Sequence, residues 1–80
     1  MSRPLAYWCC GGDLIAAHGL VLDRADAGAL HGLHLDEARA AAKAGDDPAR
    51  RAALRLAGEL SDAVAAADRW RRAGLYAAML

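Results

Sequence analysis

The stretch that decides the fold is DPARRAALRLAGELSDAVAAADRWRRAG, residues 47–74. It contains no proline after Pro48, and it ends at Gly74. An aspartate at the N-cap followed by proline at the first helical position is a helix start, and a glycine after the last turn is a helix stop. Acidic residues at its start and arginines at its end also match the helix macrodipole. The sequence therefore predicts one long helix over residues 47–73, with Asp47 as its N-cap.

This predicted helix has two faces that differ in composition. At about 100° per residue, one apolar face forms, which we expect to be the core side. Its members are Ala49, Ala53, Leu56, Leu60, Ala63, Val64, Ala67 and Trp70. A second, narrow stripe of small residues lies elsewhere on the helix and contains Leu54, Gly58, Ser61 and Ala65. Small side chains allow close approach, so the stripe is a candidate partner-binding surface; the alternative is an ordinary exposed face that tolerates such residues.

Residues 1–22 admit two interpretations. Residues 1–12 include Pro4 and end in Gly11-Gly12, which predicts an extended arm or a short strand closed by a turn. After Asp13 as a possible N-cap, apolar residues between positions 14 and 22 recur at helical spacing. The sequence thus predicts a helix there. The alternative is a hairpin with residues 5–10 and 14–22 as its strands.

Residues 23–45 predict two short helices. Asp23 or Asp26 can cap the first, which should end near His31 with Gly32 as the closing residue. Asp36 should cap the second, over residues 37–44, and Gly45 should end it. These short helices complete the predicted segment 13–45 between the arm and the long helix.

Composition supports a helical fold. The 80 residues include 22 alanines and 12 leucines but only three β-branched residues, Ile15, Val21 and Val64. Alanine and leucine are strong helix formers, whereas strands favour branched and aromatic residues. We expect a single all-α domain over residues 1–80, with three to four helices, one of them a long C-terminal helix, and an N-terminal arm that is extended or a short strand.

Residues 75–80 are an apolar tail beyond the predicted helix stop. The apolar side chains that we expect to need cover are Leu75, Tyr76, Met79 and Leu80. Two covers fit the sequence. Tyr7 and Trp8 of the arm could pack on Trp70 and Tyr76 in one aromatic cluster, or another protein chain could cover the tail. The tail therefore joins the small-residue stripe as a candidate partner-binding surface.

Metal binding and catalysis have weak support. Cys9, Cys10, His31 and His34 are the ligand types of a structural zinc site, but adjacent cysteines point apart in a strand and a predicted helix end separates the histidines. No family signature surrounds the cysteines, and the aspartates are explained as helix caps. We expect no metal, no cofactor, no small-molecule substrate and no catalytic residues, and hence a protein that is not an enzyme.

Nucleic-acid binding is the alternative function. Arg50, Arg51 and Arg55 lie at the start of the long helix, where a recognition helix contacts bases. However, four acidic residues flank them: Asp46, Asp47, Glu59 and Asp62. The net charge of the chain is zero, so the chain lacks the positive excess that drives phosphate binding. A helix-turn-helix regulator is therefore the second choice.

The predicted function is a small helical protein–protein interaction or assembly module, acting as a homo-oligomer or as an accessory subunit. The apolar residues 5–10 are too few to span a bilayer or form a secretory signal, and two adjacent cysteines do not make a disulfide scaffold. We therefore expect a cytoplasmic protein without membrane partners. Nine of its ten basic residues are arginine, which is typical of a high-GC bacterium or its phage.

Overall fold

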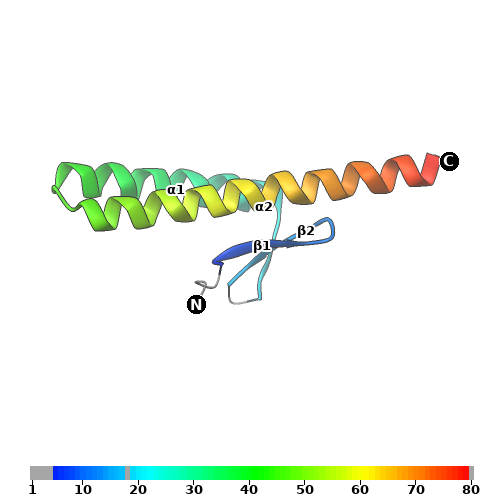
Figure 1. Ribbon diagram of the computed structural model, residues 1–80, viewed down its shortest axis with the longest axis horizontal. Coiled ribbons are helices and arrows are strands. Elements are labelled where there is room, and N and C mark those ends of the chain that lie inside the picture. Colours follow the sequence, from blue (N-terminus) through cyan, green and yellow to red (C-terminus); the bar gives the residue numbers. More distant parts are fainter. Residues whose placement is uncertain (1–4, 18, 80) are drawn as a thin grey trace.

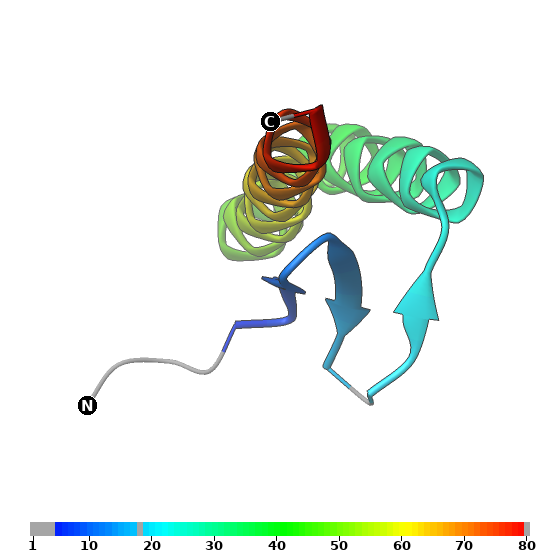
Figure 2. The same cartoon turned by 90° about the vertical axis from the view of Figure 1, so that its right-hand side faces the viewer.

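The fold is a small antiparallel sheet packed on one side of a helical hairpin. The computed structural model describes residues 5–17 and 19–79, and the side chains among them up to residue 74. Its elements are, in order, β1 (Tyr7–Cys10), β2 (Asp13–Ala16), β3 (Val21–Leu22), α1 (Arg24–Lys43) and α2 (Asp47–Met79). The sheet order is β1-β2-β3, with both pairings antiparallel. The helices lie antiparallel beside each other, and the three strands lie on one side of them (Figures 1 and 2). The predicted all-α class with three to four helices is therefore wrong, because the fold mixes two helices with a sheet.

The hairpin of β1 and β2 replaces the helix predicted for residues 14–22. Gly11 and Gly12 form a two-residue loop in which Gly11 has a φ of +61°, the positive value that a type II′ turn requires at its first loop position. Cys10 pairs with Asp13 across this loop. The apolar residues between positions 14 and 22 fit both the helical and the strand period. Leu14 and Ala16, two residues apart, are buried against the helices, which is the strand pattern. The structure supports the hairpin alternative in kind but not in its bounds, since the predicted strand over residues 14–22 is divided into β2 and β3, which pair with each other.

Helix α1 is one continuous helix of 20 residues rather than two short ones. Asp23 is its N-cap, as one of the two predicted choices, and its side chain accepts a hydrogen bond from Asp26 N at 2.7 Å. Gly32 does not end the helix, and Asp36 pairs with Arg39 at 2.9 Å instead of capping a second one. A glycine inside a helix costs about 1 kcal/mol relative to alanine, which continuous packing against α2 readily offsets.

Helix α2 contains the predicted long helix and extends beyond it at the C-terminal end. Asp46, not Asp47, is the capping residue, since its Oδ1 accepts a hydrogen bond from Ala49 N at 3.1 Å. Asp47 lies in the first turn. The predicted stop at Gly74 is wrong, because the helix continues to Met79. Alanine and leucine after Gly74 are helix formers, and no proline follows to prevent continuation.

The core lies between the inner face of the sheet and the two helices. It consists of Tyr7, Leu14, Ala16, Leu22, Ala27, Leu60 and Ala63, with partly buried Ala6, Leu30, Leu56 and Val64 against it. Most of the predicted core face of α2 is confirmed, with Leu60 only 1% exposed. Ala49 and Trp70 are exceptions, since both are exposed. Ala57, which the sequence analysis did not include, is buried where α2 faces α1.

The described members of the aromatic cluster, which was one of the two predicted covers of the tail, do not come together. Tyr7 is buried under the helices, whereas Trp8, the next residue of the same strand, lies on the opposite face of the sheet. Trp70 is 61% exposed. The side chain of Tyr76 and the residue Leu80 lie outside the described part of the chain. Among the described helices, neither has a stretch apolar and long enough to cross a membrane.

The position of Leu60 yields a direct test of the core. Leu60→Asp should lower the thermal midpoint strongly, because an unpaired carboxylate at this site costs at least about 3 kcal/mol. Arg55→Asp is the matched control on the same helix, at an exposed position. Circular dichroism melts of both variants should show a much larger loss for Leu60→Asp. An equal or smaller loss would contradict the placement of the core.

Candidate functional site

A buried polar pair connects the sheet to the helical hairpin. The Tyr7 hydroxyl lies 2.7 Å from His34 Nε2, and the two rings meet edge to face with centroids 5.7 Å apart. Both residues are buried, His34 being 7% exposed. Within the described part of the chain, His34 Nδ1 has no hydrogen-bond partner, and Glu37 Oε2 lies 3.9 Å from it. The pair fixes β1 against α1, since separating it would leave two buried polar groups unsatisfied.

The environment of Tyr7 keeps its hydroxyl protonated. Burial raises the pKa of Tyr7 above its usual 10.0, and the nearby carboxylates of Glu37 and Glu59 raise this pKa further. Glu59 also accepts a hydrogen bond from Ala6 N at 2.9 Å through Oε2. The start of β1 is therefore bonded to α1 through the Tyr7–His34 pair and to α2 through Glu59. Sequence reasoning considered His34 as a metal ligand and missed this role, although Ala27, His34 and Ala38 recur at helical spacing on the buried side of α1.

The four residues considered for zinc are not brought together. Cys9 is partly buried and Cys10 is exposed on the other face of β1, because successive strand residues point to opposite faces. His34 is engaged with Tyr7, and His31 borders a groove between α1 and α2. Over residues 5–17 and 19–79, no group of three or more His, Cys, Asp or Glu side chains is placed to hold a metal ion.

The predicted partner-binding stripe of α2 lies on the exposed part of the hairpin. Leu54, Gly58, Ser61 and Ala65 are all exposed, Leu54 by 42%. Leu54 borders a shallow groove whose α1 side is lined by Leu35, Ala38, Arg39 and Ala42. Ser61 borders a second groove beside Gly28 and His31. The stripe thus runs along the seam between the two helices.

The predicted tail is part of α2 rather than a separate segment. Leu75, Tyr76 and Met79 belong to the helix, with side chains outside the described set, and Leu80 lies outside the described residues. At 3.6 residues per turn, positions 76 and 79 fall within about 40° of position 54. The helix therefore aligns these two tail positions with the stripe, which the predicted stop at Gly74 had separated.

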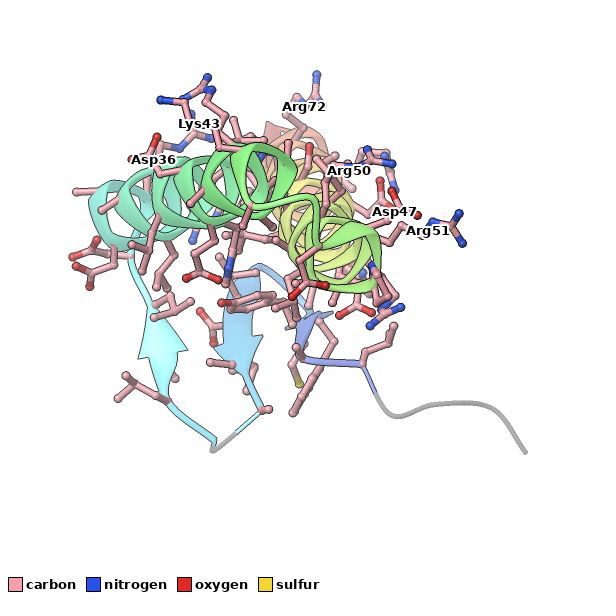
Figure 3. The ribbon with its side chains drawn as sticks, turned by 90° about the vertical axis from the view of Figure 1, so that its left-hand side faces the viewer. Asp36, Lys43, Asp47, Arg50, Arg51 and Arg72 are labelled. Carbon is pink, nitrogen blue, oxygen red and sulfur yellow. The ribbon has the colours of Figure 1, made fainter. Side chains whose placement is uncertain are left out.

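The arginines considered for DNA binding lie at the loop end of the hairpin. Arg50 and Arg51 pair with Asp47 at 2.8 and 2.7 Å, and Arg55 is exposed. Figure 3 shows the Asp47, Arg50 and Arg51 side chains grouped at this end and directed outward. An aspartate between two arginines reduces the local positive potential, so no observation favours phosphate binding here.

A third exposed surface, on the outer face of the sheet, was missed from the sequence. Trp8 pairs with Ile15, and Ile15 pairs with Val21, so these three side chains form a row across all three strands. Both helices lie on the other side of the sheet (Figure 2). Trp8 is 36% and Val21 59% exposed, whereas Ile15 between them is partly buried. We call Trp8, Ile15 and Val21 the outer row. The sequence signal for the outer row was that both the odd and the even positions of these strands carry apolar residues, which places apolar side chains on both faces of the sheet.

Comparison with known proteins adds no relative. No protein-family model, curated protein or solved structure gives a significant match to the chain. Functional inference therefore depends on the geometry of the surfaces described above.

The raised pKa of Tyr7 predicts a specific dependence of stability on pH. The folded state keeps a proton that the unfolded chain releases near pH 10, so the contribution of Tyr7 to stability is complete below that pH and is lost as the pH rises through the folded pKa. Tyr7→Phe should remove this alkaline loss. It should also lower neutral-pH stability by about 1–3 kcal/mol, because His34 Nε2 is left unpaired. Urea unfolding from pH 8 to 11 measures both effects, and parallel pH profiles for the two proteins would contradict the prediction.

Proposed function

We propose that this protein works by binding another protein chain, either as a homo-oligomer or as an accessory subunit. The observation that carries the proposal is the outer row, Trp8, Ile15 and Val21, on a sheet that the described helices cover on the other face. Contiguous exposed apolar side chains on a small protein are typical of interaction surfaces. In a sheet whose outer face meets only water, each strand alternates apolar residues on the inner face with polar residues on the outer face.

The small core supports the proposal independently. Of the eleven buried hydrophobic residues described, seven are alanine: Ala16, Ala27, Ala38, Ala53, Ala57, Ala63 and Ala67. Alanine removes little apolar area from water, and the stabilisation is about 25 cal/mol per Å² of area buried. Domains of about 80 residues with a limited core often gain stability by association. Meanwhile larger apolar side chains, such as Leu33, Leu54 and Trp70, remain exposed.

The alignment of the stripe with positions 76 and 79 supports a second contact area on α2. The stripe lies along the seam of the hairpin, where small residues and shallow grooves allow a helix to approach closely, and positions 76 and 79 follow on the part of α2 that extends past α1 (Figure 1). We also propose a reducing compartment such as the cytoplasm, since both thiols, Cys9 and Cys10, are free.

Association in solution tests the proposal. Light scattering coupled to chromatography should give a mass above the 8.4 kDa of one chain, rising with concentration in the micromolar range. For the accessory-subunit form, a tagged chain should retain one specific protein that excess untagged chain displaces. A monomer at all concentrations that also retains no displaceable protein would contradict the proposed function.

The stripe is tested by Leu54→Glu in the same assays. A carboxylate within a protein contact should weaken binding by at least about tenfold, which corresponds to 1.4 kcal/mol. Ala40→Glu is the matched control, because Ala40 is an exposed helical alanine of α1 outside both grooves. Equal binding by the two variants would remove the stripe from the contact surface.

A further inference from the structure

We infer that the partner is a different protein that binds through an acidic amphipathic helix, and that this helix lies along the seam between α1 and α2 on the side opposite the sheet. The inference rests on the proposed function and names the class of partner and the surface that it contacts. It comes from the two grooves of the seam, their spacing and the charges around them.

The two shallow grooves follow each other along the seam. Apart from basic residues at their borders, they are lined by apolar or small side chains: Ala27, Gly28, Leu60, Ser61 and Val64 in the first, and Leu35, Ala38, Ala42 and Leu54 in the second. A Cβ atom added at Gly28 or Gly58 would meet no described atom within 4 Å, so the helix backbone is accessible at both positions. The seam therefore offers two apolar depressions that another chain can approach closely.

The spacing of the grooves fits one helix of about four turns. Their α1 sides are centred near residues 28 and 39, and a rise of 1.5 Å per residue places them about 16 Å apart. An α-helix brings residues i and i+11 onto nearly the same face at this separation. Two apolar residues about 11 positions apart on a partner helix therefore enter both grooves at once, as in other complexes of an amphipathic helix with an apolar groove.

The charges around the seam are mainly positive. Figure 3 shows Lys43, Arg50 and Arg72 on the side of the helices opposite the strands. We call this side the grooved face. Its charged residues are Arg24, Asp36, Arg39, Lys43, Asp47, Arg50, Arg51, Asp68 and Arg72. Six of them are basic and three acidic, whereas the rest of the chain has four basic and seven acidic residues. The positive excess of the grooved face is complementary to an acidic partner.

The aspartates of the grooved face leave its arginines accessible to a partner. Each aspartate pairs with at least one arginine: Asp36 with Arg39, Asp47 with Arg50 and Arg51, and Asp68 with Arg24. Such ion pairs at the surface contribute about 0–1 kcal/mol, so an arginine can exchange its aspartate for a partner carboxylate at small cost. Lys43 and Arg72 have no carboxylate partner within the part of the chain that the structure describes.

The same features disfavour two other occupants. A second copy that met this chain through its own grooved face would bring two positive surfaces together. A nucleic acid would pair its phosphates with the basic side chains but would leave both apolar grooves unfilled. An acidic helix with apolar anchors matches the charge and the grooves together.

Synthetic helical peptides test the inference. The probe, the Glu peptide, has about 18 residues, with leucine at i, i+4, i+7 and i+11 and glutamate on its other face. The Lys peptide has lysine at each glutamate position, and a scrambled Glu peptide keeps the composition without the apolar face. By fluorescence anisotropy, the Glu peptide should bind at least about tenfold more tightly than either of the other two. Leu54→Glu should weaken its binding at least about tenfold, and Ala40→Glu should not.

Charge reversal separates the grooved face from the other basic residues of the chain. The double variant Lys43→Glu, Arg72→Glu should lower the affinity for the Glu peptide by at least about threefold, because it reverses two charges of this face. Arg55→Glu is the matched control, since Arg55 is exposed on α2 but lies outside the grooved face. It should change the affinity less than the double variant does.

Three results would overturn the inference. They are no saturable binding of the Glu peptide at millimolar concentration, equal binding of its scrambled form, and tighter binding of the Lys peptide. Homo-oligomers that Leu54→Glu dissociates would assign the grooved face to a second copy instead. Nanomolar binding of duplex DNA that the double variant abolishes would assign it to nucleic acid. Failure of the peptides alone leaves the proposed function standing, because that function is tested by the mass of the chain in solution and by the displaceable protein.

Discussion

The packing of the sheet's inner face on Leu60 is the contact on which the rest of the structure depends. Leu60 is the most completely buried large side chain among the described residues, and it belongs to one cluster with Tyr7, Leu14 and Ala27. Three alanines of the same cluster, Ala16, Ala27 and Ala63, allow strand and helix to approach closely there. A core of this kind has little area to lose, since each alanine contributes little burial. The position of the sheet relative to the helices is consequently set by how closely their backbones approach each other rather than by large side chains between them.

Polar contacts at the periphery orient the sheet on this core. The Tyr7–His34 pair joins β1 to α1, and Glu59 and Arg71 hold the two ends of β1 and its loop to α2. Gly12 permits the last contact, because a side chain at this position would lie 3.0 Å from Arg71 Cγ. Net hydrogen bonds are modest individually, but breaking a buried one is costly. The strands are thus held in a fixed orientation, with β1 at a free edge and the outer row facing away from the helices.

This arrangement relates the fold to the proposed function. Short strands need a hydrophobic face or packing against a helix to be stable in water, and here the two helices stabilise the sheet from one side. The long α2, which extends past α1 and the sheet, adds further surface without adding core (Figure 1). The molecule measures 54 × 30 × 18 Å, so a large part of the chain is near the surface. The proposed recognition of another chain would use such a surface without requiring catalytic side chains.

The sequence by itself determined the long helix, its acidic start and most of its buried face, because these follow from local capping and a sustained 3.6-residue period. It also determined the exposed stripe of Leu54, Gly58, Ser61 and Ala65, since helical periodicity alone separates it from the core. Tertiary structure decided the helix ends and the choice between helix and strand where local sequence signals fitted both alternatives. Gly32 and Gly74 permit a stop without requiring one, and α1 and α2 continue through them. The run from Asp13 to Leu22 fits both periods, and only packing against Leu60 selects strands. The outer row and the Tyr7–His34 pair depend on strand register and on contacts between residues far apart in the chain, which no local pattern encodes.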